Sequence, residues 1–177
     1  MGILLTIAVV IGLIIALALV LALFVKKDYS VERDIIINRN KQEVFDYLKL
    51  IRNQEKYSVW VMKDPNVKIV YTGTDGTVGF TSSWTSDDKN VGVGEQEIKS
   101  INEGESMEVE VRFKKPFEAT NYALTTVNTT TGGQTTVTSS FFGQCKFPMN
   151  VMFVFMSKIL GKDMQKNLEN MKANIEK

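Results

Sequence analysis

The stretch GTDGTVG, residues 73–79, has a glycine at every third position. Glycine-rich loops of this kind can bind phosphate, so the stretch is a candidate for a nucleotide site. A P-loop needs Lys and then Ser or Thr after its last glycine, and a dinucleotide-binding loop needs a strand before it and a helix after it. Here Phe80 follows the last glycine, and the segment from Thr77 to Trp84 alternates like a strand. Asp75-Gly76 is a dipeptide typical of tight turns between strands. We therefore interpret GTDGTVG as a β-hairpin turn rather than a nucleotide site.

The remaining reactive side chains do not form a recognisable catalytic set. The sequence contains no His, which excludes Ser-His-Asp triads, Cys-His pairs and His-ligated metals. Cys145 is the single cysteine, so no intramolecular disulfide can form. Two acidic pairs, Glu95 with Glu97 and Glu108 with Glu110, have the spacing that places both carboxylates on one face of a strand. The second pair alternates with valines, so we interpret it as a solvated face, and we expect no catalytic residue, metal or cofactor.

The net charge argues against a nucleic-acid partner. Lys and Arg number 21 and Asp and Glu number 20, so the formal net charge is only +1. A nucleic-acid-binding domain would carry a clear basic excess. Residues 26–177 hold all of these charges, and residues 28–177 suffice for one domain with its own hydrophobic core.

Residues 3–25 form an uninterrupted apolar run without a charged side chain. As a helix, this run would be about 34 Å long at ~1.5 Å per residue, enough to cross a hydrocarbon core of about 30 Å. A cleaved signal peptide is the alternative, but it would have basic residues before a shorter apolar core and a small-residue cleavage site after it. We therefore predict a transmembrane anchor over residues 1–27 and a folded domain over residues 28–177.

Basic residues near the apolar run predict its orientation in the membrane. All of those within reach follow the run and none precedes it. They are Lys26, Lys27, Arg33, Arg39 and Lys41. Because basic residues favour the cytoplasmic side of a span, we expect a single-pass protein of the cell membrane with its domain in the cytoplasm.

The hydrophobic periods of residues 28–177 predict an α+β domain. Apolar residues alternate with period two in seven segments, which are expected to be strands at 29–38, 67–71, 78–84, 91–101, 107–113, 119–128 and 134–142. Asn40 and Glu43 form a capping pair for a helix after the first strand, and Asn53 can cap a second short helix. Pro148 opens a long C-terminal helix with a methionine-rich stripe. Six consecutive strands between helices indicate an antiparallel sheet with helices on one face.

Four segments carry a resemblance to a known family: DYSVERDIIINRNKQEVFDYLKLIRNQEKYSVW, GTDGTVGFTSSW, GVGEQEIKSINEGESMEVEVRFKKPFEAT and the terminal FPMNVMFVFMSKILGKDMQKNLENMKANIEK. Together they resemble the SRPBCC or START-like superfamily, and more closely bacterial polyketide cyclase/dehydrase and lipid-transport proteins with an N-terminal membrane helix. The resemblance implies a helix-grip fold, in which a seven-stranded antiparallel sheet curls around the long C-terminal helix. It also implies a cavity for a hydrophobic small molecule or lipid, but it transfers no catalytic residue, because one fold hosts many functions.

Aromatic and methionine side chains on these elements are the expected cavity lining. The candidates are Trp60, Phe80, Trp84, Phe113, Tyr122, Met152 and Met156. Each has an alternative interpretation as ordinary core, since aromatic residues dominate any core and methionine fills irregular gaps in one.

Three functions are consistent with these features, and the first is favoured. It is a membrane-tethered binding protein for a hydrophobic small molecule or lipid, which needs a largely apolar cavity with few polar groups. The second is a cyclase- or dehydratase-like enzyme, which would have to work without histidine. The third is a non-enzymatic regulatory module that binds a membrane partner through its surface.

Overall fold

The computed structural model describes residues 2–177, with the side chains of residues 152, 154 and 155 left aside. Its helices are α1 (Gly2–Phe24), α2 (Lys41–Leu48), the 3-10 helix η1 (Ile51–Lys56), α3 (Val59–Met62) and α4 (Asn150–Ile175). Its strands are β1 (Asp28–Ile37), β2 (Lys68–Thr72), β3 (Thr81–Thr85), β4 (Val93–Asn102), β5 (Ser106–Lys115), β6 (Ala119–Thr129) and β7 (Thr135–Gln144). The order of elements follows the predicted one, except that η1 and α3 lie where the sequence predicts a single second short helix.

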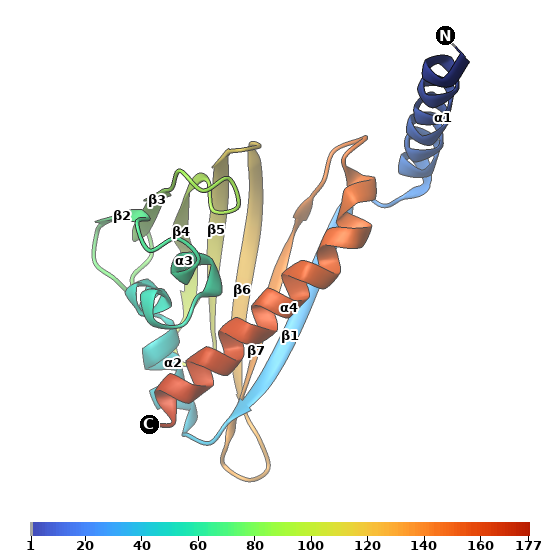
Figure 1. The fold of residues 1–177 in the computed structure, drawn as a ribbon. Coiled ribbons are helices and arrows are strands. Elements are labelled where there is room, and N and C mark those ends of the chain that lie inside the picture. The colour runs from blue at the N-terminus through green and yellow to red at the C-terminus, as the bar shows by residue number, and fades with distance from the viewer. Residues whose placement is uncertain (1) are drawn as a thin grey trace.

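The strands form one seven-stranded antiparallel sheet in the order β1-β7-β6-β5-β4-β3-β2. Helix α4 runs diagonally across the β1 and β7 side of the sheet, and its C-terminal half meets α2 and η1 (Figure 1). Helix α1 projects away from the domain beside the start of α4. The predicted α+β helix-grip fold, with one apolar N-terminal helix, is confirmed.

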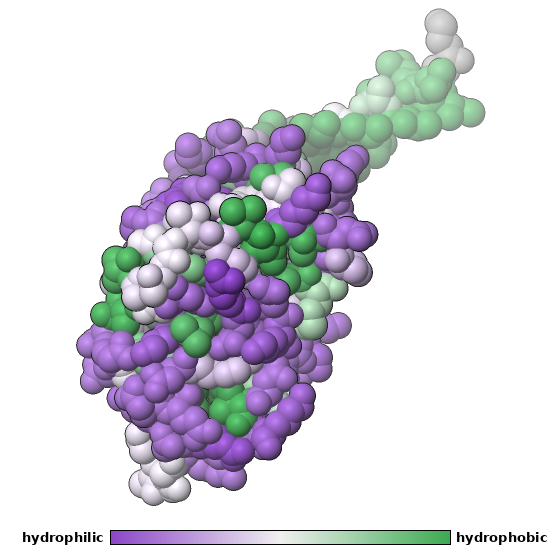
Figure 2. All heavy atoms as spheres, turned by 90° about the vertical axis from the view of Figure 1, so that its left-hand side faces the viewer, coloured by the Kyte–Doolittle hydropathy of each residue, from purple (hydrophilic) through white to green (hydrophobic). Residues whose placement is uncertain are grey.

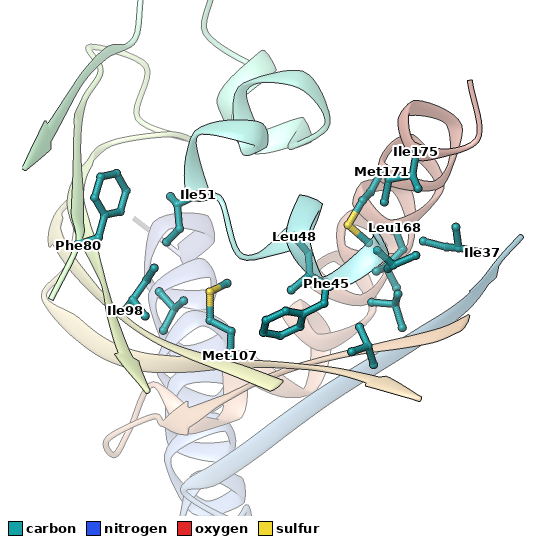
Figure 3. Close-up of a cluster of buried hydrophobic side chains, with 14 of the residues drawn as sticks. Ile37, Phe45, Leu48, Ile51, Phe80, Ile98, Met107, Leu168, Met171 and Ile175 are labelled. Atoms are coloured by element: carbon teal, nitrogen blue, oxygen red, sulfur yellow. The ribbon is translucent and has the colours of Figure 1, made fainter. Parts of the chain in front are cut away.

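The hydrophobic core fills the end of the domain where α2 and the C-terminal half of α4 cover the sheet. Phe45 and Leu48 of α2 point towards the sheet, between the side chains of α4 and those of β4 and β5 (Figure 3). Phe45 is completely buried. We call the face of the sheet that carries these contacts the inner face, and it holds the side chains of Val109 and Val111 of β5.

The start of α2 follows the predicted capping pattern. The Asn40 side-chain carbonyl accepts a hydrogen bond from the Glu43 backbone amide at 2.9 Å, and its amide donates to the Glu43 carboxylate at 3.2 Å.

The second helix, η1, differs from the prediction. It begins at Ile51, and the Asn53 side chain does not cap it but donates to the Tyr47 carbonyl. The backbone amides of Ile51 and Arg52 donate to the carboxylate of Asp75 at 2.8 and 3.1 Å. An acidic side chain from a distant loop therefore caps η1.

Asp75 belongs to GTDGTVG, and the structure confirms that this stretch connects two antiparallel strands, β2 and β3. Gly73, Gly76 and Gly79 all have positive φ angles, of 89°, 76° and 87°. Such angles suit glycine, because other residues there bring Cβ too close to the backbone. The glycine spacing thus shapes a loop that places Asp75 at the start of η1, and β3 begins at Thr81 rather than at the predicted Val78.

Candidate ligand-binding surface

The inner face stays partly open at the end of the sheet nearest α1. Two half-buried aromatic rings on different strands, Trp84 and Phe113, lie there, and we call them the aromatic floor. The Trp84 and Phe113 rings meet edge to face with their centroids 5.7 Å apart. Gly94 lies between their strands, and any larger residue there would collide with the Trp84 ring. The sequence therefore leaves space so that this ring can lie flat on the sheet.

The aromatic floor continues into a groove of about 470 Å³ between α3 and the edge strand β2. Its hydrophobic lining residues are Val61, Met62, Pro65, Val67 and Ile69, and Tyr71, Glu55 and Asp64 add polar groups. Ile69 is opposite Trp84 in the strand register, so the two side chains share the inner face. The groove and the aromatic floor therefore adjoin on the inner face, and the groove combines hydrophobic side chains with a comparable share of polar surface.

Tyr71 is one of the polar groups of this groove. Its hydroxyl donates a hydrogen bond to Glu55, its ring stacks on Phe80 at 5.8 Å, and the Arg52 guanidinium lies 4.1 Å above the same ring. Burial, followed by the hydrogen bond to Glu55, raises the pKa of Tyr71 above its ordinary value. The hydroxyl is therefore neutral at physiological pH, and it adds a hydrogen-bonding phenol beside the acidic side chains of Glu55 and Asp64.

A second polar pair lies on the inner face under the first half of α4. The Tyr29 hydroxyl donates to the side-chain carbonyl of Asn121 at 2.5 Å, and the Tyr29 ring stacks on Phe153 of α4. Burial, followed by the nearby Cys145, raises the pKa of Tyr29 to about 12, which keeps the hydroxyl protonated. Asn121 is buried, and Gly143 opposite it leaves the space that its amide occupies. These neutral polar groups can orient a ligand but supply no acid or base near neutral pH.

Comparison with known proteins places this arrangement in a family. Residues 28–176 match the family model for polyketide cyclase/dehydrase and lipid transport proteins. The chain belongs to the polyketide cyclase/dehydrase and lipid transport family. The match covers essentially all of the domain that follows α1. A search of curated protein sequences finds no match to this chain.

Solved structures show that this family member shares its fold with distant proteins. The di-domain aromatase/cyclase StfQ from steffimycin biosynthesis has a TM-score of 0.63 at 11% identity, and the match covers 83% of this chain and 50% of StfQ. A hypothetical protein from Helicobacter pylori has a TM-score of 0.62 at 14% identity, with 84% and 88% of the two chains covered. A Chromobacterium violaceum protein has a TM-score of 0.59 at 10% identity, with 84% and 97% covered.

The predicted lining residues of this family member divide into two groups. Trp84 and Phe113 form the aromatic floor, whereas Phe80 is 1% exposed, belongs to the core beneath Tyr71 and does not line the groove. Trp60 of α3 is more exposed and donates its indole N–H to Asp163 of α4 at 3.3 Å. The structure thus brings two of the predicted residues, Trp84 and Phe113, into one region of the inner face.

The sequence predicts Met152 and Met156 of α4 as cavity lining, and the structure describes the side chain of Met156 alone of the two. Met156 is exposed on α4, as is Ile159 one turn further along. The side chain of Met152 lies outside the described residues. The stripe closer to the C-terminus, formed by Met164, Leu168, Met171 and Ile175, is buried, which agrees with its interpretation as core.

The prediction for Tyr122 is wrong, because this residue lies on the other face of the sheet. Its register partner is Glu110, which alternates with the buried Val109 and Val111, and its ring stacks on Phe142. Its hydroxyl donates to Glu110 at 3.3 Å. Tyr122 therefore belongs to the outer, polar face of the sheet and not to the inner face.

That outer face carries an ion-pair network centred on Arg112. The guanidinium contacts the carboxylates of Glu95 at 2.8 Å, Glu97 at 2.9 Å and Glu110. Hydrogen bonds from Lys114 and then Arg112 lower the pKa of Glu95, and hydrogen bonds from Lys99 and then Arg112 lower that of Glu97. The acidic pair Glu95 and Glu97 therefore forms ion pairs with one arginine on the outer face.

Replacing Arg112 with methionine is expected to lower the free energy of unfolding by about 1–2 kcal/mol near pH 7, because three carboxylates lose a shared cation. A lowered carboxylate pKa contributes stability above the unfolded pKa of about 4.3 and loses it as the pH falls through the folded pKa. The difference between the two proteins should therefore shrink as the pH falls below about 4. Urea unfolding monitored across this pH range measures it. A difference independent of pH would contradict the ion-pair explanation.

Sequence reasoning missed the groove residues Ile69, Tyr71 and Met62 and the pair Tyr29 and Asn121 as site residues. Tyr71 and Ile69 alternate in a predicted strand, so their common face was visible in the sequence, but their place at an edge beside α3 was not. Tyr29 and Asn121 meet only because β1 and β6 both flank β7. No local sequence signal reports such a contact between residues 92 positions apart.

Proposed function

We propose that this protein binds a hydrophobic small molecule or lipid on the inner face of its sheet and is tethered to the membrane by α1. Membership of the polyketide cyclase/dehydrase and lipid transport family supports hydrophobic ligand binding, and the aromatase/cyclase neighbour has the same fold. The ligand would lie between the aromatic floor, the groove beside α3 and the first half of α4.

The observation that carries the proposal is the contrast between the two ends of the inner face. At the α2 end, Phe45, Ile98 and Val137 are fully buried under the helices. At the α1 end, Trp84 and Phe113 are only partly covered and lead into the groove beside α3. Partly exposed aromatic rings that adjoin a groove are typical of sites that bury an apolar ligand.

The polar groups near this surface suit recognition rather than chemistry. Tyr29, Asn121 and Tyr71 offer neutral hydroxyl and amide groups close to an apolar surface, which is the usual composition of a ligand pocket. Among the described residues there is no group of acidic or cysteine side chains that could hold a metal ion. The arrangement therefore favours a binding protein.

The tether is part of the proposal. Helix α1 spans 23 residues, is the one described helix long and apolar enough to cross a membrane, and has almost no side chain buried against the domain. With the basic residues on its C-terminal side, the domain would lie in the cytoplasm, close to the lipids of the inner leaflet.

The full chain, purified gently in detergent, is expected to carry a hydrophobic adduct in native mass spectrometry. Met62→Glu places a carboxylate in the groove and should lower adduct occupancy by about tenfold or more, because an unpaired charge is costly beside apolar surface. Val70→Glu is the matched control, because Val70 is exposed on the other face of β2.

Lipid that associates only with α1 would be retained equally by both variants. An adduct that is lost from Met62→Glu and kept by Val70→Glu supports binding at the groove. Equal occupancy in both variants, or no adduct in the original protein, would refute the proposed function.

A further inference from the structure

Two loops with exposed hydrophobic side chains lie at the same end of the sheet as α1. The strand register places Asn121 of β6 opposite Gly143 of β7, and Gln144 of β7 opposite Asp28 of β1. The loop that precedes β6, residues 116–118, and the loop that follows β7, residues 145–149, therefore lie at the same end of the sheet as the start of β1. Figure 1 shows the tops of these loops reaching the height at which α1 ends. We call residues 114–118 and 145–149 the rim.

The end of α1 is fixed to this rim. Only residues 25–27 separate α1 from β1, and they span at most about 14 Å. The side-chain amide of Asn150, at the start of α4, donates to the backbone carbonyls of Ala22 and Val25 at 2.7 and 2.8 Å. Asn150 is 1% exposed, so these bonds to the last turn of α1 are shielded from water. A membrane that surrounds α1 must therefore have its surface close to the rim.

The rim has the composition of a membrane-interface contact. Phe117 is 70% exposed, Phe147 is 45% exposed and Met149 is 42% exposed, so their side chains lack cover from the protein. Basic residues flank them in the sequence and include Lys114, Lys115 and Lys146, with Lys26 and Lys27 at the end of α1. Aromatic side chains beside lysines suit the boundary between acyl chains and anionic headgroups.

We propose that the rim is a second membrane-contact surface, which inserts Phe117, Phe147 and Met149 into the interface of the bilayer that α1 spans. The proposal rests on the membrane-spanning role of α1 given above. The bilayer is the occupant that the geometry favours, because α1 places it next to these side chains, whereas a soluble partner would have to compete with it.

This contact would turn the open end of the inner face towards the lipids. Phe113 of the aromatic floor is in the same strand as Lys115 of the rim, and the Trp84 indole N–H donates to the Val91 carbonyl in the neighbouring β3–β4 loop. The aromatic floor thus adjoins the rim along β5. A hydrophobic ligand could then pass from the bilayer to the inner face with little exposure to water.

Depth-dependent fluorescence quenching tests the rim in the full chain. In a Cys145→Ser background, the dye NBD is attached through Glu118→Cys at the rim or through Gly132→Cys in the β6–β7 hairpin at the opposite end of the sheet. Both proteins are reconstituted into vesicles of phosphatidylcholine and phosphatidylglycerol that contain a nitroxide-labelled lipid. We expect about threefold or stronger relative quenching at position 118, because interfacial side chains are buried about 5–10 Å into the headgroup boundary. Adding Phe117→Ser with Phe147→Ser should reduce that quenching.

Flotation of the vesicles distinguishes a failure of the α1 anchor from a failure of the rim contact. Floated protein with quenching at 118, little at 132 and a decrease in the double variant supports membrane contact by the rim. Floated protein with equal quenching at both positions, or with none at 118, overturns it while leaving the α1 anchor intact. Protein that does not float refutes both the anchor and the rim contact that depends on it.

Discussion

Replacing Phe45 with alanine is expected to lower the free energy of unfolding of the domain by about 3–5 kcal/mol. Phe45 is completely buried and lies between α2, the sheet and the C-terminal half of α4 (Figure 3). Removing its ring loses the transfer free energy of a large apolar side chain and leaves a cavity that its neighbours fill only in part. Since domains of this kind are stable by about 5–15 kcal/mol, this single change would remove a large share of the total.

The measurement is urea unfolding of the full chain in detergent, followed by tryptophan fluorescence. Phe117→Ala is the matched control, because it removes the same ring from a position that is mostly exposed. The control should change the free energy of unfolding by no more than about 0.5 kcal/mol. If the two variants lost similar stability, the α2 end would not be the tightly packed core that the structure shows.

The same core explains why the fold could be predicted from the sequence. Strand periods, the Asn40 cap and the resemblance of the domain to a family all indicated one architecture, because burial of one face imposes a regular pattern on each element. The prediction failed where backbone conformation rather than side-chain pattern decides the structure. Val78 continues an alternating pattern, but the positive φ of Gly79 keeps it in a loop, so β3 starts later than predicted.

The candidate site was less predictable, because its members come from different strands. Trp84 and Phe113 lie on the inner face, since each continues the alternation of its strand, and their role as ligand contacts stays a prediction. Tyr122 was placed on the wrong face, because Thr, Asn and Ala surround it in β6 and no clear pattern shows which side is buried. In such a strand the face is set by its register with β5, which a single sequence does not reveal.

Exposed hydrophobic side chains are distributed differently on α1 and on the domain. Figure 2 shows α1 as hydrophobic along its described length, whereas hydrophobic side chains on the facing side of the domain occur in separate patches among hydrophilic ones. The apolar surface of α1 is therefore much larger than the domain could cover. By length and composition α1 could cross a membrane, and a signal sequence near the N-terminus would meet the same criterion.

Charged substitutions in α1 are therefore expected to abolish its membrane integration. Leu13 and Leu17 are exposed near the middle of α1, so their replacement does not disturb the packing of the domain. A lysine at the centre of a span costs about 2.5–3.5 kcal/mol and forfeits the favourable insertion of leucine, so two of them cost about 6–8 kcal/mol. Leu13→Lys with Leu17→Lys should move most of the protein out of the carbonate-resistant membrane fraction, whereas Leu13→Val with Leu17→Val should leave it there.

Intact-mass analysis of the unmodified protein completes this test, because a signal peptide would pass the same hydropathy criterion. The anchor predicts that the mature chain retains α1 and that the double-lysine variant becomes extractable with carbonate. A mature chain that lacks α1, or a double-lysine variant that stays resistant, would contradict it. If the rim also binds lipid, the extractable variant should keep a weak, salt-sensitive affinity for anionic vesicles, because the lysines beside Phe117 and Phe147 remain. The two membrane contacts could thus be told apart. Lysines in α1 would abolish the anchor because they raise its insertion free energy, whereas added salt would weaken the rim contact because it screens the lysines.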